Sequence, residues 1–128
     1  MNFLLDTHVF LWLAGNISLV PGHVLTVLQQ HESTLFLSSV SVWEIEQKFR
    51  VGKLKLHAEP RKIIAEFYRK YDIAALPFHE ESAFLLEKLP LLHGDPFDRM
   101  LVCQAIHHGF TIVSGDRHIQ RYPVNTLW

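Results

Sequence analysis

NFLLDTH at residues 2–8 joins a short apolar run to an aspartate, and a similar arrangement returns twice along the chain. LFLSS at residues 35–39 ends an apolar run with two serines, and FTIVSGD at residues 110–116 ends another with an aspartate. Apolar runs of this length are typical of strands buried in a sheet. A carboxylate at the end of a buried strand is unfavourable unless positive charge meets it, so several such strand ends side by side indicate a shared metal ion.

Segments with helical spacing separate the strands, and this alternation predicts an α/β fold with a mainly parallel sheet covered by helices on both faces. The predicted strands are residues 2–6, 34–38, 73–76, 110–114 and 124–128, and the predicted helices are residues 7–14, 21–31, 40–51, 60–71, 79–89 and 96–108, with one further helical turn at 117–121. In such a sheet ligands bind outside the carboxyl ends of the strands, where the strand order reverses. We therefore expect Asp6, the Ser38-Ser39 corner and Asp116 to lie at one edge of the sheet.

The bulk composition excludes several classes of protein. The 128 residues fit one domain, 1–128, and a hydrophobic fraction of 48% is enough to bury a core. A formal net charge of -1 excludes a global basic field, so nucleic-acid binding would require a local basic patch. The single cysteine, Cys103, excludes an internal disulfide and suits a reducing compartment, and its apolar helical surroundings predict a buried thiol. No basic leader or bilayer-long apolar run is present, so we expect a soluble cytoplasmic protein without membrane contact.

Most of these aspartates also have a purely structural interpretation. Asp6 could cap the helix that follows it, and Asp116 could be an ordinary turn residue. Asp95 favours a cap, because it precedes a proline at a preferred first helical position. Asp98 is harder to explain in this way, since its helix is apolar on most sides and a buried carboxylate needs a cation or several donors. His93 lies near these acids and could contact substrate, although a loop role is favoured.

Glu44 lies a full turn inside its predicted helix, where capping does not explain it. The alternative is an i,i+4 ion pair with Lys48 on an exposed face. Glu46 should point roughly 200° away around the helix and is assigned to solvent. Oxygen donors without an accompanying Cys or His pattern favour Mg²⁺ or Mn²⁺ over zinc. Ser114 and Thr7 flank the acids and could hold a metal-bound water, orient a carboxylate, or serve only as turn hydroxyls.

The chain resembles a PIN domain, specifically the VapC type of toxin ribonuclease from toxin–antitoxin systems. The resemblance covers essentially the whole length, and its specificity comes from the order and spacing of the motifs together. These motifs are LLDTH at residues 4–8 with Trp12, SVSVWEI at 39–45 followed by GKLKL at 52–56, DPFDRML at 95–101 with Gln104 and Ala105, and IVSGD at 112–116.

The resemblance implies a three-layer α/β/α PIN-like fold and a metal-dependent endoribonuclease that uses Mg²⁺ or Mn²⁺. Carried over position by position, the catalytic and metal-binding acids of the family correspond to Asp6, Glu44, Asp98 and Asp116. Asp95 matches a position typical of the subgroup but outside this quartet, which implies a supporting role. Ser114 stands where the family often has Thr or Ser. Gly115 stands where Arg or Asn is frequent, so a substrate contact from that side chain is in doubt.

The resemblance also implies partners. Family members are commonly homodimers, and the toxins among them are held inactive by a small antitoxin protein whose tail fills a groove over the active site. A VapBC-type toxin is the favoured interpretation. The alternatives are a housekeeping PIN nuclease in RNA processing and a non-catalytic PIN-fold binding module, and the intact acidic quartet argues against the second.

A run of basic residues follows Glu44 closely, at Lys48, Arg50, Lys53 and Lys55. These side chains could follow the RNA backbone as a local basic patch, or they could simply form a solvated helix face and turn. Arg99 adjoins Asp98 and could meet either a phosphate or a neighbouring carboxylate.

Overall fold

A computed structural model describes residues 1–128 and contains one five-stranded sheet. The strands are β1 (Asn2–Leu5), β2 (Thr34–Ser38), β3 (Ile73–Leu76), β4 (Thr111–Val113) and β5 (Thr126–Leu127). All four pairings are parallel, and the strand order is β3-β2-β1-β4-β5. The predicted parallel sheet is therefore confirmed. The chain moves outward from β1 through β2 to β3 and then adds β4 and β5 on the other side, so the order reverses between β1 and β4.

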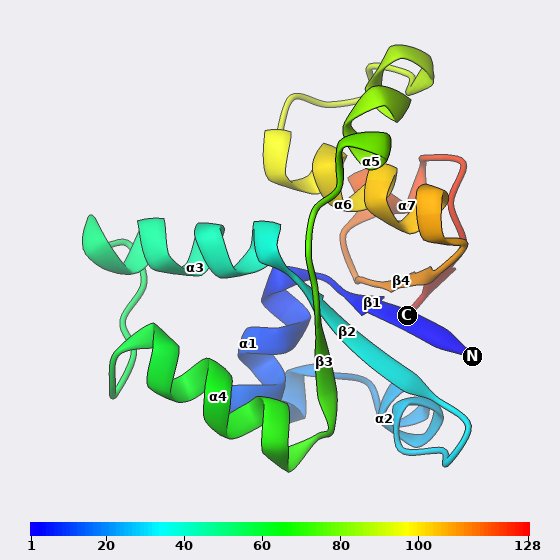
Figure 1. Ribbon diagram of the computed structural model, residues 1–128. Helices are drawn as coiled ribbons and strands as arrows, with labels where there is room; N and C mark the ends of the chain where they lie inside the picture. Colours follow the sequence, from blue (N-terminus) through cyan, green and yellow to red (C-terminus); the bar gives the residue numbers. More distant parts are fainter.

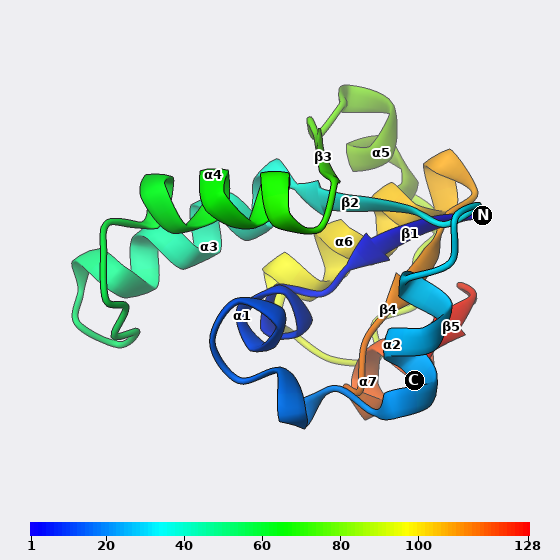
Figure 2. The same ribbon diagram turned by 90° about the horizontal axis from the view of Figure 1, so that it is seen from below.

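Helices cover both faces of this sheet, which confirms the predicted three layers (Figure 1). They are α1 (Thr7–Gly15), α2 (Gly22–Leu28), α3 (Ser39–Arg50), α4 (Pro60–Lys70), α5 (Glu80–Phe84), α6 (Pro96–His108) and α7 (Arg117–Gln120), with 3₁₀ turns η1 (Ile17–Leu19) and η2 (Leu85–Lys88). Helices α5, α6 and α7 lie on one face, and α1, α2 and α4 lie on the other. Figures 1 and 2 both show α3 and α4 side by side, extending beyond the ends of the strands.

Two hydrophobic cores result from the alternation of side chains along each strand. Phe3 and Leu5 of β1 pack into a core of 16 buried residues with α1, α2 and α4. Leu4, between them, packs into a second core of 11 buried residues with α6 and α7. The apolar runs of the sequence are thus buried on both faces, as a covered parallel sheet requires. Cys103 belongs to the second core and is buried, as predicted.

The helix α6 begins and ends where the sequence predicts. Asp95 occupies the N-cap position and accepts hydrogen bonds from two backbone amides, and Pro96 is the first helical residue. Gly109 ends the helix with a φ of 71°, in the left-handed region that glycine adopts without strain. The strands β2 and β3 also have their predicted bounds, 34–38 and 73–76. None of the helices is both long enough and apolar enough to cross a membrane.

Two predicted helices are shorter than expected. The helix predicted over 79–89 is α5 followed by the 3₁₀ turn η2, and Pro90 favours the extended conformation that Leu89 adopts (φ −78°, ψ 125°). The helix predicted over 21–31 ends at Leu28, because Ser33 closes the turn toward β2. Its hydroxyl donates to the Val27 carbonyl at 2.7 Å, which satisfies a helix-end acceptor without a further helical turn.

The C-terminal residue returns to the beginning of the chain. Trp128 packs against Trp12 of α1, with ring centroids 5.7 Å apart. Its indole also covers Gly115, and a Cβ atom at that position would lie 2.5 Å from Cε2 of Trp128. This contact gives a physical reason why glycine, and not a larger side chain, occupies position 115.

We expect Gly115→Ala to lower the free energy of unfolding by about 1–3 kcal/mol, because the new methyl group forces Trp128 off its packing position. Gly94→Ala is the matched control, since a Cβ atom there meets nothing within 4 Å, and it should change stability by less than about 0.5 kcal/mol. Urea unfolding of both variants, followed by Trp fluorescence, measures the difference. Equal stabilities would show that Trp128 does not constrain position 115.

Candidate functional site

Asp6 follows β1 directly, at the point where the strand order reverses. Its amide donates to the Val113 carbonyl at 3.0 Å, which ties the end of β1 to the end of β4. Asp6 occupies the N-cap position of α1, but its side chain makes no capping hydrogen bond. The side chain is only 3% exposed. Capping therefore does not account for this buried carboxylate.

Ser114 connects two of the acids. Its hydroxyl donates to Oδ2 of Asp6 at 2.7 Å and accepts from the Asp116 amide at 3.0 Å. Of the roles left open by the sequence, Ser114 thus orients a carboxylate. Asp116 caps α7, because its Oδ1 accepts from the His118 amide at 2.7 Å. The cap uses one of its two oxygens. Asp116 can therefore be a structural residue at this turn and still have an oxygen free for a metal ion.

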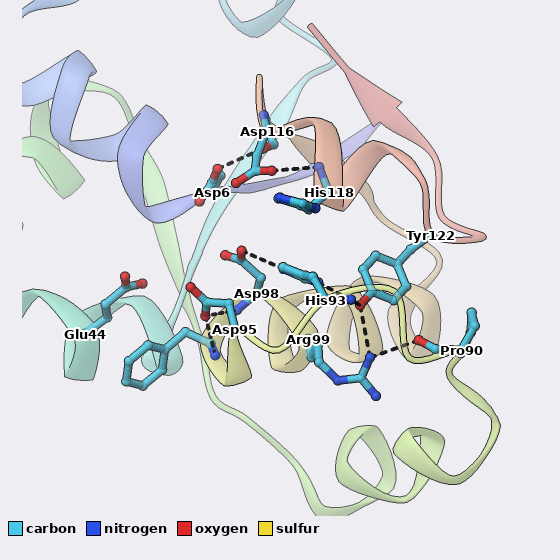
Figure 3. Close-up of polar contacts among 12 residues, drawn as sticks. Asp6, Glu44, Pro90, His93, Asp95, Asp98, Arg99, Asp116, His118 and Tyr122 are labelled. Atoms are coloured by element: carbon cyan, nitrogen blue, oxygen red, sulfur yellow. Dashed lines mark hydrogen bonds and ion pairs between the residues drawn. The ribbon is translucent and has the colours of Figure 1, made fainter.

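Asp95 and Asp98 differ in how their carboxylates are used. Oδ1 of Asp95 accepts from the amides of Phe97 and Asp98, at 2.9 and 3.1 Å, so the predicted cap is confirmed. Asp98 makes no cap, and its Oδ2 lies 3.0 Å from Nε2 of His93. Its side chain is 15% exposed. Figure 3 shows Asp6, Asp98 and Asp116 directed toward a common space at the edge of the sheet.

Glu44 stands apart from these three aspartates, on α3 (Figure 3). It is buried, and its Oε2 accepts from the Lys48 ammonium at 2.6 Å. The i,i+4 pair left open by the sequence is therefore present, but its acid is buried rather than on an exposed face. Thr7 donates to the Ser41 hydroxyl at 2.8 Å, and both are buried. Thr7 thereby joins the start of α1, next to Asp6, to α3, which carries Glu44.

Burial and mutual repulsion perturb the aspartates. Burial raises the pKa of Asp6, against the hydrogen bond from Ser114, and the negative charge of Asp116 adds to the increase. Burial likewise raises the pKa of Asp98 to about 6, and the charges of Asp95, Asp6 and Asp116 contribute in the same direction. The hydrogen bond from His93 opposes that increase. The aspartates are thus close enough to destabilise one another's charged forms, which is the condition that a bound cation relieves.

Lys48 is the cation that pairs with Glu44. The hydrogen bond to Glu44 is the main cause of its raised pKa, and the charges of Asp95 and Asp98 also contribute. As the side chains stand, no three His, Cys, Asp or Glu residues are grouped closely enough to hold one metal ion. The donors nevertheless fit a hard divalent ion chemically, because they are carboxylate oxygens, partly desolvated, in a place where positive charge is stabilised.

The basic residues divide between paired and free. Arg50 binds Glu59 at 2.5 Å and lies 3.5 Å from Glu46. The side chain of Glu46 is 41% exposed, in agreement with its assignment to solvent. Arg99 donates to the Pro90 carbonyl and the Tyr122 hydroxyl, each at 2.9 Å, so of the two contacts left open by the sequence the one with a neighbouring carboxylate is not made. Lys53 is exposed and makes no ion pair.

Sequence reasoning placed His93 near the acids but favoured a loop role for it, and it missed His118 and Tyr122. His93 is engaged through both ring nitrogens, His118 stacks on it, and Tyr122 hydrogen-bonds to it. His93 lies five residues before Asp98, and that short spacing was the one available signal. Tyr122 had none, because it reaches the site only through the fold.

Comparisons with known proteins agree with the fold. The sequence profile described as PIN domain matches residues 3–125. No curated protein matches the chain significantly in sequence. Among solved structures, a chain of VapBC2 from Rickettsia felis is similar with a TM-score of 0.74 and 18% identity, over 99% of this chain and 98% of that one. In that structure VapBC2 is bound to a DNA fragment from its promoter. A chain of DNA-bound VapBC from Salmonella typhimurium gives 0.66 and 19%, over 99% and 97%. A chain of VapBC-1 from nontypeable Haemophilus influenzae gives 0.67 and 15%, over 99% and 97%.

The perturbed Asp98 carboxyl makes stability depend on pH in the metal-free protein. Its pKa is about 6 in the folded chain and 3.8 ordinarily, so the folded state binds more protons between these values. The free energy of unfolding should therefore fall as pH rises from about 4 to 6, by less than the ~3 kcal/mol that the full shift would give at about 1.4 kcal/mol per pKa unit, because solvent screens this partly exposed carboxyl.

Asp98→Asn should remove most of that slope and raise stability at pH 7. Asp72→Asn is the control, because Asp72 is exposed, makes no contribution to the raised pKa of Asp98, and has a positive φ of 53° that asparagine tolerates. The measurement is urea unfolding in EDTA from pH 4 to pH 7. An unchanged slope in Asp98→Asn would contradict the assignment.

Proposed function

The chain belongs to the PIN-domain family, and from this premise we propose that it is a metal-dependent endoribonuclease that hydrolyses RNA phosphodiester bonds. The observation that carries the proposal is the convergence of Asp6, Asp98 and Asp116 at the edge between β1 and β4. This is the place where parallel α/β sheets bind their ligands. It is also the place where the protein keeps carboxylates whose charged forms are disfavoured by burial and repulsion.

The residues proposed to hold Mg²⁺ or Mn²⁺ are Asp6, Glu44, Asp98 and Asp116. When bound, the ion supplies positive charge to the phosphate and lowers the pKa of a nucleophilic water. The chain's own contribution is placement. Ser114 fixes the rotamer of Asp6, and the cap on α7 fixes Asp116. Without a cation the carboxylates repel the phosphate, so the metal-free protein should be inactive.

The RNA backbone would approach along α3. Lys48 pairs with Glu44 and is affected by the charges of Asp95 and Asp98, and Lys53 is exposed without an ion pair. These two are therefore the proposed phosphate contacts. Arg50 is neutralised by Glu59 and is the weaker candidate. Contact of Arg99 with a phosphate stays a prediction. Because the net charge is -1, such contacts are local.

We further propose that the protein is the toxin of a VapBC-type pair, which forms a homodimer and binds a small antitoxin. Support comes from the shape shared with chains of VapBC complexes along nearly their whole length. A groove of about 610 Å³ between α3 and α4 suits a small amphipathic partner. Apolar side chains and four charged ones line it: Val42, Glu46, Arg50, Glu59, Arg61, Ile64, Ala65 and Tyr68. Trp43, also on α3, is 66% exposed.

The purified protein should cleave single-stranded RNA in Mg²⁺ or Mn²⁺ and stop when EDTA is added. Asp98→Asn and Glu44→Gln should abolish cleavage, because each removes a carboxylate proposed to hold the ion. Glu46→Gln is the matched control on the same helix, because its side chain is 41% exposed and lies 3.5 Å from Arg50, outside the proposed metal site, and it should cleave at the parental rate. Electrophoresis of a labelled RNA measures the rates, and circular dichroism confirms that each variant is folded.

Cleavage that persists in EDTA, or in a folded Asp98→Asn variant, would refute the metal site. No cleavage of any RNA by the metal-loaded parent would favour the non-catalytic binding module.

Expression in a bacterial host separates the toxin from a housekeeping nuclease. The toxin proposal predicts growth arrest by the parent, none by Asp98→Asn, and rescue by co-expression of a small neighbouring gene. Colony counts after induction measure the effect. Normal growth with an active purified enzyme would leave the nuclease proposal intact and refute the toxin.

A further inference from the structure

A chain of hydrogen bonds connects Asp98 to the loop before α6, and the proposed function does not use it. Nε2 of His93 lies 3.0 Å from Oδ2 of Asp98, and Nδ1 of the same ring lies 2.8 Å from the Tyr122 hydroxyl. Arg99 donates to that hydroxyl at 2.9 Å and to the Pro90 carbonyl at 2.9 Å. Figure 3 shows these side chains leading from the acids toward the loop before α6.

The direction of each proton follows from the donors. The guanidinium of Arg99 can only donate, and the His93 backbone amide also donates to the Tyr122 oxygen, at 3.3 Å. The tyrosine oxygen therefore accepts two hydrogen bonds, and its own hydroxyl proton is donated to Nδ1 of His93. Since Nδ1 accepts, the neutral ring carries its proton on Nε2. That proton is the one donated to Asp98.

The chain of bonds is rigid because its members are shielded and anchored at both ends. Tyr122 is 3% exposed, and the His93 side chain is 11% exposed. Arg99 also lies over the Tyr122 ring, 5.9 Å from its centroid. A side chain held at both ring nitrogens in this way has little freedom to rotate. It also has no nitrogen left to bind a metal itself.

His93 is also linked to Asp116. The ring of His118 stacks on it, with centroids 4.9 Å apart and planes 7° apart. The His118 amide donates to Oδ1 of Asp116. One imidazole thus fixes Asp98 directly and contacts the residue that fixes Asp116, and these acids come from α6 and from the end of β4.

We propose that His93 is a positioning residue that holds Asp98 in the orientation that the metal site needs, with Tyr122 and Arg99 fixing its tautomer and ring plane. The inference rests on the proposed function for its purpose, but the hydrogen-bond pattern can be tested without it. Groups that hydrogen-bond to a metal-binding carboxylate orient it, and their removal typically lowers metal affinity by about 10–100-fold.

The first test is the tautomer. In metal-free protein with ¹⁵N-labelled histidine at pH 7.5, NMR should show His93 with a pyrrole-type Nε2 and a pyridine-type Nδ1. Comparison with His93→Gln identifies its signals among the nine histidines. Tyr122→Phe should move the Nδ1 signal, because that nitrogen loses its donor. A protonated Nδ1 in the parent would overturn the hydrogen-bond pattern, and with it the proposal.

The second test is Mn²⁺ affinity, measured by calorimetry on variants that circular dichroism shows to be folded. His93→Leu and Tyr122→Phe should each weaken binding by about 10–100-fold. His93→Gln should retain more affinity than His93→Leu, since its amide can still donate to Asp98. Tyr71→Phe is the matched control, because it loses a hydroxyl that donates to the Leu13 carbonyl at 3.1 Å, and it should bind like the parent.

The outcomes separate this inference from the proposed function. Tight Mn²⁺ binding by the parent with equal binding by a folded His93→Leu variant would overturn the positioning role and leave the nuclease proposal intact. A parent that binds no Mn²⁺ would overturn both. Weakening by His93→Leu and Tyr122→Phe, with Tyr71→Phe unaffected, would support the positioning role whichever RNA is cleaved.

Discussion

The burial of Asp6 at the point where the strand order reverses is the constraint on which the rest of the site depends. A carboxylate that is 3% exposed must find donors or a cation. Ser114 supplies one donor, and the nearby Asp116 adds repulsion. The two hydrophobic cores must offset the remaining cost. A cation that binds here would recover that energy, so metal binding and stability are linked through the same carboxylates.

The aspartates differ in how many backbone amides donate to them, and this difference helps to separate caps from candidate metal ligands. Asp95 accepts two amides, both at Oδ1, and serves as a cap. Asp116 accepts one amide and keeps its second oxygen. Asp6, although it stands at an N-cap position, makes no capping bond. The carboxylates with the fewest backbone donors are those that a cation would stabilise most, which is why cap position alone does not distinguish structural from functional acids.

Residues distant in sequence complete the site. Trp128 covers Gly115 and thereby excludes a side chain between Ser114 and Asp116. Tyr122, after α7, holds the imidazole of His93, which in turn holds Asp98 at the start of α6. The C-terminal segment is therefore part of the site's architecture, although it carries none of the proposed metal-binding acids.

Local signals in the sequence located the elements and the candidate acids. The bounds of β2, β3 and α6, the cap at Asp95 and the exposure of Glu46 follow from periodicity and capping, whose signals lie within about four residues. Local signals also erred where a proline or a turn hydroxyl ended a helix early, as in α5 and α2. Other contacts follow from how the chain folds in space: Glu44 is buried where it pairs with Lys48, Arg99 donates to Tyr122, and Ser114 donates to Asp6 across 108 residues. Those contacts depend on the path of the chain through space, because residues far apart in sequence carry no local pattern that records their meeting.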